Sequence, residues 1–332
     1  MAQTMVLSQY DHLFKDKPKS ISVTATVSTK SDSQLGSVRD IVRYFVRRAS
    51  RNGSLNFEPP RTDELKAQVL KEIDELGIDV SSIQRWLTWA CQVAEGFYPY
   101  HPMDLKVLIT ICNLAIFHID DNLSKTPEIL HAFQLNLLTG ITQSDPILEC
   151  LSKVLIPRMW KYYHPLAANA IAIGFYEFIQ GTAMESLTKN MKHHPSAPEF
   201  PEYVRLKSGA PAQYAYWLFY HPARPDITPF VQAIPDFLAI INRVNDILSF
   251  YKEELAGEDD NFVHMRAKLA GKGVVAALDE ICEETLLLID CISDTLTDTP
   301  EHQIIFQEFI VRYLRFHTST TRYRLKELMA ES

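Results

Sequence analysis

The spacing of apolar side chains constrains this chain more than any other feature of its sequence. From Ser37 to the C-terminus, apolar residues recur at intervals of three and four, and the alternation expected of strands is largely absent. The clearest stretch, 236–256, carries a stripe of Phe237, Ile240, Ile241, Val244, Ile247, Leu248, Tyr251 and Leu255. Such a stripe buries one face of a helix against a bundle. The sequence therefore predicts an all-α fold, with ten or more helices in one domain over residues 37–332.

Residues 1–36 differ from the rest of the chain. This stretch is rich in Ser and Thr and has no large apolar periodicity, so we expect a mobile polar leader. It lacks the apolar core of a signal peptide. The longest apolar run, Val107–Ile119, is interrupted by Asn113 and is too short to span a bilayer. Five cysteines without a CxxC pair favour buried free thiols in a reducing compartment. The sequence predicts a soluble cytoplasmic protein without a membrane span.

Composition narrows the function classes. The formal net charge of −8 argues against a nucleic-acid partner, which requires clustered lysine and arginine, and fits an acidic site that holds metal ions. Hydrophobic residues make up 46% of the chain, which is enough for a large core and for the walls of a cavity. No HExxH, GxSxG, Walker or GxGxxG string occurs. Chemistry based on those motifs therefore finds no support.

Three oxygen-bearing side chains follow one face of the 236–256 helix. Asn245, Ser249 and Glu253 are spaced at i, i+4 and i+8, beside the apolar stripe. An amide, a hydroxyl and a carboxylate form the all-oxygen ligand set that Mg²⁺ prefers. The alternative for such a row, taken alone, is a solvated polar face.

An aspartate pair ends a second apolar helix, the one that begins near Asp104. Asp120 and Asp121 face the negative end of the helix dipole and repel each other, which is unfavourable unless a cation lies between them. This arrangement favours a metal site. The alternative is a polar turn before the next helix, which Thr126 and Pro127 would start.

The string NDILSFYKE identifies a resemblance. It matches the ND-x-x-S-x-x-KE metal motif of the fungal sesquiterpene cyclases of the trichodiene synthase family at Asn245, Asp246, Ser249, Lys252 and Glu253. The resemblance implies a class I terpene synthase bundle around a central apolar cavity. It also implies three Mg²⁺ ions, two of them bridged by Asp120, while Asp121 pairs with a C-terminal arginine on closure. The chain departs from the family pattern at Ser124, where a further acid is expected.

The resemblance also assigns cations to the diphosphate. Arg205 is similar to the family's diphosphate-sensing arginine, which precedes a helix broken near a glycine, here Gly209, and Pro211 supports such a break. Arg322 and Tyr323 match the C-terminal arginine–tyrosine pair of the family, and Lys252 adds a point charge. Without the resemblance, each cation would be interpreted as an ordinary surface residue.

A carbocation needs walls that do not react with it, and aromatic faces attract cations. Asn113, Ile116 and Phe117 share a helix face with Asp120, and we expect them to line the pocket. The further candidates, each of which is also compatible with a plain core position, are Phe97, Tyr98, Tyr176, Tyr216, Trp217 and Tyr313.

The implied reaction is Mg²⁺-dependent ionisation and cyclisation of a prenyl diphosphate, with farnesyl diphosphate as substrate, by an enzyme that can form a homodimer. One alternative is a non-catalytic isoprenoid-binding relative, which the change at Ser124 suggests. The other is a chain-elongating prenyltransferase, which would need a second aspartate-rich motif where this chain has Asn245, Ser249 and Glu253.

Overall fold

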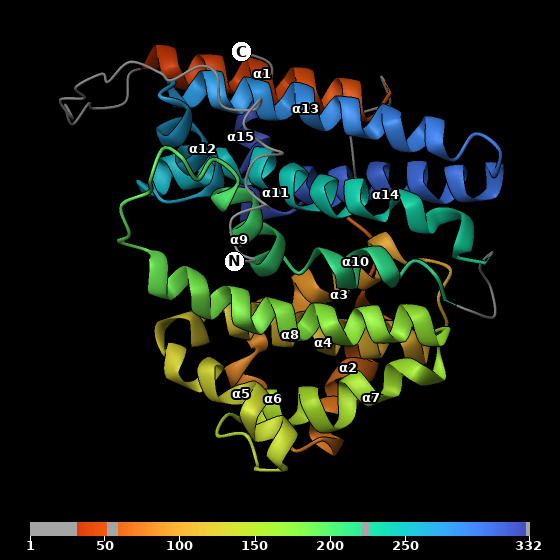
Figure 1. Ribbon diagram of the computed structural model, residues 1–332. Coiled ribbons are helices and arrows are strands. Elements are labelled where there is room, and N and C mark those ends of the chain that lie inside the picture. Colours follow the sequence, from red (N-terminus) through yellow and green to blue (C-terminus); the bar gives the residue numbers. More distant parts are fainter. Residues whose placement is uncertain (1–31, 52–58, 221–225, 330–332) are drawn as a thin grey trace, which may run out of the picture. The chain divides into compact units, whose positions relative to one another are not determined.

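The structure is a computed structural model, and it describes residues 32–51, 59–220 and 226–329. One compact unit spans Ser33–Ser332. Its α-helices are α1 (Asp32–Ala49), α2 (Asp63–Glu75), α3 (Leu87–Phe97), α4 (Met103–Asp121), α5 (Pro127–Thr139), α6 (Pro146–Cys150), α7 (Ile156–Arg158), α8 (Pro165–Thr188), α9 (Phe200–Ser208), α10 (Pro211–Tyr216), α11 (Ile234–Ala256), α12 (Phe262–Ala270), α13 (Val274–Thr295), α14 (Pro300–Ser319) and α15 (Leu325–Met329) (Figure 1). The prediction of an all-α fold is confirmed, since these described ranges contain only one isolated β-bridge, between Tyr163 and Tyr220.

Local sequence signals set many of the helix boundaries. Proline occupies the first turn of α5, α8, α10, α11 and α14, where its missing N–H costs no helical hydrogen bond. Gly257 ends α11 with a left-handed φ of 76°, as expected for a helix C-cap. The helix predicted over 236–256 begins two residues earlier, at Ile234. At the other end of the chain, α1 starts at Asp32, inside the predicted leader, and residues 1–31 lie outside the described ranges.

The core surrounds α4, which is buried without interruption from Leu105 to Ile119. Helix α4 packs against α2 and α3, and α3 in turn packs against α14. Helix α8 contacts α5, α9 and α10, while α11 contacts α10, α13 and α14 (Figure 1). Both predicted metal motifs therefore lie on helices of the central packing.

The burial of the cysteines and the length of the apolar helices can be compared with the sequence predictions. Four of the five free cysteines are buried as predicted, but Cys291 on α13 is exposed. None of the described helices is both long and apolar enough to cross a bilayer.

The chain between α9 and α10 is the predicted helix break. Helix α9 ends at Ser208, Ala210 takes a left-handed φ of 53°, and α10 restarts at Pro211. Two glycines make room for this break. A Cβ on Gly181 of α8 would stand 2.5 Å from the carbonyl carbon of Lys207, and a Cβ on Gly209 would stand 1.9 Å from Asn242 Oδ1. A side chain on Gly181 would overlap the backbone of α9, and one on Gly209 would overlap the side chains of Asn242 and Arg205.

Candidate active site

A cavity of about 130 Å³ lies where α3, α4, α8, α9, α10, α11 and α14 meet the short 3₁₀ helix η9 (Thr321–Tyr323). It is lined by Val93, Phe97, Ile116, Phe117, Asp120, Phe178, Arg205, Ser208, Gly209, Tyr214, Ile241, Asn245, Tyr313, Phe316, His317, Arg322 and Tyr323. The two metal motifs are 125 positions apart in the sequence, yet Asp120 and Asn245 share this one cavity. The predicted Arg205, Arg322 and Tyr323 line it as well.

Asp120 and Asp121 differ in how the protein holds them. Asp121 accepts a hydrogen bond of 2.6 Å from the Trp86 indole and lies 4.0 Å from Arg322 Nη2. Asp120 lines the cavity and stays accessible to solvent. Partial desolvation by the protein atoms around the cavity raises the pKa of Asp120, and the neighbouring charge of Asp121 raises it further. The pair therefore stores unfavourable charge at the cavity, which a cation would relieve.

Asn245 projects from α11 with a fixed carboxamide. Its Oδ1 accepts a hydrogen bond from Arg205 Nη2 at 3.1 Å. Its Nδ2 lies 3.2 Å from His317 Nε2 and 3.3 Å from the Tyr323 hydroxyl. Burial lowers the pKa of His317 to about 4, so this ring is neutral near pH 7. Asn245 thus connects Arg205 to His317 and to Tyr323.

Arg205 ties α9 to α11. Its Nε donates to both carboxylate oxygens of Asp246, at 2.8 and 3.0 Å. Although burial works in the opposite direction, Asp246 and Glu185 raise the pKa of Arg205, so the guanidinium remains charged. Burial raises the pKa of Asp246 to about 7, and the hydrogen-bonded guanidinium opposes that shift. Because Asp246 and Asn245 engage Nε and Nη2, the guanidinium is held at the cavity wall in a single orientation.

The remaining motif residues lie on the next turns of α11. Ser249 is buried, and Glu253 lies 3.0 Å from both Lys252 Nζ and Asn261 Nδ2. These side chains continue the row that starts at Asn245, but they do not line the cavity. Glu253 is engaged by protein donors that a bound cation would have to displace.

Arg322 and Tyr323, both in η9, also line the cavity. The Arg322 guanidinium lies 5.2 Å from the Trp89 ring centroid and 5.4 Å from that of Phe117, both in cation–π geometry. The Tyr323 ring lies 4.3 Å from the His317 ring. Arg322 Nη2 also lies 4.0 Å from Asp121 Oδ1, and that this pair acts on closure stays a prediction.

Some of the residues that the sequence predicted for the cavity wall do line it, and others do not. Ile116, Phe117, Phe97 and Tyr313 line it. Asn113 does not, because it is fully buried behind Tyr214, whose hydroxyl donates to Asn113 Oδ1 at 2.8 Å. Tyr98, Tyr176, Tyr216 and Trp217 are also absent from the wall. The lining residues that the sequence did not reveal are Val93, Phe178, Ser208, Tyr214, Ile241, Phe316 and His317.

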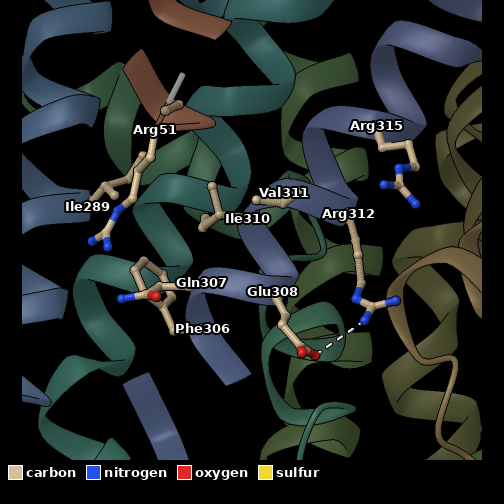
Figure 2. A pocket seen from close by; sticks show the side chains of 10 residues that line it. Arg51, Ile289, Phe306, Gln307, Glu308, Ile310, Val311, Arg312 and Arg315 are labelled. Carbon is tan, nitrogen blue, oxygen red and sulfur yellow. Dashed lines mark hydrogen bonds and ion pairs between the residues drawn. The ribbon is translucent and has the colours of Figure 1, made fainter. Parts of the chain in front are cut away.

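A larger cavity, of about 340 Å³, lies elsewhere (Figure 2). It is formed mainly by one face of α14, from Phe306 to Arg315, together with Arg51 and Ile289. Figure 2 shows Glu308 and Arg312 of this face forming an ion pair, with a distance of 3.2 Å. None of the motif residues lines it. We therefore place the candidate active site in the smaller cavity, where the motif residues converge.

The donor set fits a hard cation. Among the described residues, no group of three or more His, Cys, Asp and Glu side chains has a metal-binding arrangement. A metal at this site would therefore depend on the Asp120 carboxylate and the Asn245 amide oxygen, which line the cavity, and on the Ser249 hydroxyl and the Glu253 carboxylate, which lie outside its lining. Such mixed oxygen sets suit Mg²⁺, which retains water and substrate oxygens among its ligands.

Comparisons with known proteins agree with this geometry. The family model for trichodiene synthase (TRI5) matches residues 73–332. Terpene synthase BipA of Cochliobolus sativus is 32% identical over 247 residues, which cover 73% of this chain and 75% of that protein. Monoterpene synthase 25 of Postia placenta is 30% identical over 292 residues, covering 88% and 86%.

A solved structure shares the fold. The linalool/nerolidol synthase from Streptomyces clavuligerus superposes with a TM-score of 0.58 at 13% identity, covering 79% of this chain and 98% of that one. At this identity the likeness concerns the fold alone. The family model and the two relatives carry the assignment further: the chain belongs to the trichodiene synthase family.

Proposed function

We propose that this terpene synthase ionises farnesyl diphosphate and cyclises the resulting carbocation to a sesquiterpene, with release of diphosphate. The observation that carries the proposal is the convergence of Asp120, Asn245, Arg205 and Arg322 on one cavity with aromatic walls. A non-catalytic isoprenoid-binding protein would not need both metal motifs beside the cationic residues. An elongating prenyltransferase would need a second aspartate-rich motif where this chain has Asn245.

The proposed cofactor is Mg²⁺, with three ions in the loaded enzyme. When bound, the ions would withdraw charge from the diphosphate oxygens and make that group a better leaving group. Asp120 and the Asn245, Ser249 and Glu253 row would hold them. Arg205 and Arg322 offer forked donors to phosphate oxygens, and Lys252 adds a mobile point charge.

The apolar part of the cavity would receive the prenyl chain. Phe97, Phe117, Phe178 and Phe316 line the cavity, and aromatic ring faces stabilise cations by about 0.5–2 kcal/mol each. Closure of the cavity behind a bound prenyl chain would exclude water from the carbocation.

The test is a product assay. The purified chain is incubated with Mg²⁺ and, separately, with farnesyl or geranyl diphosphate, and volatile products are analysed by gas chromatography. The geranyl arm is included because one relative is named a monoterpene synthase. A cyclic fifteen-carbon product supports the proposal. Turnover of geranyl diphosphate alone would replace the proposed substrate, and no product from either would favour the binding protein. Adding isopentenyl diphosphate tests for chain elongation.

A further inference from the structure

His317 lies between Asn245 of α11 and Tyr323 of η9, although it belongs to neither metal motif. It projects from α14 into the cavity and is only 1% exposed. Its ring packs edge-on to Tyr313, with centroids 4.6 Å apart, and lies 4.3 Å from the ring of Tyr323. Both of its nitrogens have partners, so its orientation is fixed on two sides.

The hydrogen-bond partners of His317 determine which of its two ring nitrogens carries the proton. Nδ1 lies 2.8 Å from the carbonyl oxygen of Tyr313, which can only accept a hydrogen bond. Nδ1 therefore carries the proton. Nε2, on the other side of the ring, faces Asn245 Nδ2 at 3.2 Å.

The same reasoning fixes the carboxamide of Asn245. Arg205 Nη2 can only donate, so the atom 3.1 Å from it must be the amide oxygen. The amide nitrogen then points to His317, and Nε2 must accept its proton. An amide oxygen has two lone pairs. Arg205 uses one of them, and the second remains available at the cavity.

Replacing His317 by a residue without an acceptor at the place of Nε2 would allow the Asn245 carboxamide to rotate. The Tyr323 hydroxyl would remain as the other acceptor for Asn245 Nδ2, at 3.3 Å. That hydroxyl accepts only one of the two amide hydrogens, so the hydrogen that faces position 317 would have no acceptor. A carboxamide that rotates presents its NH₂ group, which cannot bind a cation.

We propose that His317 is a positioning residue that holds the Asn245 carboxamide with its nitrogen toward His317 and its oxygen toward Arg205 and the cavity, and so sets the affinity for Mg²⁺. The proposal rests on the proposed function, because it assumes that Asn245 is a metal ligand. It extends that function to a helix that carries no metal motif. Partners that orient metal ligands typically change metal affinity by about 10–100-fold when they are replaced.

The test compares two substitutions of His317. Phenylalanine preserves the aromatic ring and its packing but has no acceptor, whereas the Oε1 of glutamine can replace Nε2. Binding of Mg²⁺ is measured by isothermal titration calorimetry in the presence of inorganic diphosphate, without turnover. We expect His317→Phe to weaken Mg²⁺ binding by about 10-fold or more. His317→Gln should remain within about threefold of the wild type.

The control is His302→Phe, the same change at a buried position on the same helix. His302 contacts the Asp226 carbonyl and does not line the cavity, so Mg²⁺ binding should not change. A purely structural role for His317 predicts the reverse order, with phenylalanine better tolerated than glutamine. Equal Mg²⁺ binding by the wild type and His317→Phe would overturn the positioning role. If the wild type itself binds no Mg²⁺ with diphosphate, the metal assignment fails instead.

A measurement on the wild type covers the case in which the variants do not fold. Histidine labelled with ¹⁵N distinguishes the Nδ1–H tautomer from the Nε2–H tautomer. With Mn²⁺ in place of Mg²⁺, paramagnetic broadening selects the rings near the metal. We expect a broadened signal from a neutral Nδ1–H ring. If the broadened rings are all of the other tautomer, or none is broadened, the proposal is wrong.

Discussion

Arg322 Nη2 and Asp121 Oδ1 lie 4.0 Å apart, which joins the C-terminal segment to the last residue of α4. Both side chains are partly exposed, at 21% and 30%, so the pair itself contributes little to stability. It does, however, keep Arg322 above Phe117 and at the cavity. The same guanidinium thus contacts the aspartate motif and an aromatic wall of the site.

A double-mutant cycle separates stability from catalysis at this pair. Asp121→Asn and Arg322→Gln should couple by only about 0.2–1 kcal/mol in the free energy of unfolding. In turnover of farnesyl diphosphate, Arg322→Gln should lower kcat/KM by about 100-fold or more, because it also removes a forked phosphate donor. Arg322→Lys retains the charge and should recover part of the loss. Equal kinetic losses for Asp121→Asn and Arg322→Gln would contradict a direct role of Arg322 at the diphosphate.

Asp120→Asn should have opposite effects on activity and on metal-free stability. Activity should fall by about 100-fold or more, because a metal-binding charge is lost. The folded state raises the pKa of Asp120, so it binds more protons than the unfolded state, and the metal-free wild type loses stability as pH rises from the ordinary value of 3.8 through the raised pKa. The variant lacks this slope. In EDTA at pH 7 its melting temperature should exceed that of the wild type; a lower value would show that the aspartate pair is not repulsive.

Ser124→Asp would restore the acid that the family pattern expects. The added carboxylate should lower the Mg²⁺ concentration for half-maximal activity by a few-fold and destabilise the metal-free protein through repulsion with Asp120. Ser124→Ala is the matched control, because it removes only the 2.5 Å hydrogen bond from the serine hydroxyl to the Asp120 carbonyl. Identical Mg²⁺ requirements in both variants would mean that position 124 lies outside the metal site.

Asp145 supports the end of α4 from α6. It accepts hydrogen bonds from the backbone N–H groups of Ile147 and Leu148, both at 3.0 Å, and lies 2.9 Å from His118 Nε2. Although burial opposes it, these contacts hold the pKa of Asp145 below its ordinary value of 3.8. The stability that this carboxylate provides is therefore complete above that value and is lost as pH falls through the lowered pKa.

Two substitutions divide the contribution of Asp145. Asp145→Ala removes both the helix cap and the pair with His118 and should cost at least about 1–2 kcal/mol of unfolding free energy. Asp145→Asn keeps an acceptor for the cap, so its loss of unfolding free energy should be smaller. In a thermal unfolding series from pH 2 to 6, its melting temperature should fall less steeply at acidic pH than that of the wild type. If the melting temperature of Asp145→Asn falls at acidic pH as steeply as that of the wild type, the ionised form of Asp145 is not the source of this stability.

Gly209→Ala should be severe for a substitution of one methyl group. The new Cβ would overlap Asn242 Oδ1 at 1.9 Å and approach Arg205 Nη1 at 2.7 Å. We expect a loss of about 1–3 kcal/mol in stability and a larger fractional loss of kcat, since Arg205 must move. Gly96→Ala on α3 is the control, because its nearest contact is an ordinary 3.9 Å and alanine favours helix. Similar behaviour of the two variants would contradict the close packing at the break.

Much of the site could be predicted because its chemistry is local in the sequence. Asp120 and Asn245 belong to short sequence motifs, and the complete match of NDILSFYKE to the family motif, more than helical spacing alone, predicted metal binding. The break after Ser208 could be predicted because a glycine and a proline interrupt the helical pattern. These signals do not depend on how the helices pack.

The parts that could not be predicted depend on packing. Phe178 comes from α8, a helix that is apolar on most of its faces, so periodicity does not identify its cavity side. Asn113 shares a face with Asp120, but Tyr214 from the distant α10 covers it. A single histidine such as His317 is an ordinary core residue until α14 is placed against α11. Its position five residues before Arg322 was the only sequence signal.

The two glycines at the helix break bear on how such an enzyme could be redesigned. Substitution at Gly181 would shift the backbone of α9, and substitution at Gly209 would displace the side chains of Asn242 and Arg205. Val93, Phe178 and Phe316 also line the cavity, and each already carries a side chain whose size can be changed. Libraries aimed at new terpene skeletons should therefore vary these three positions and leave the backbone of the break intact.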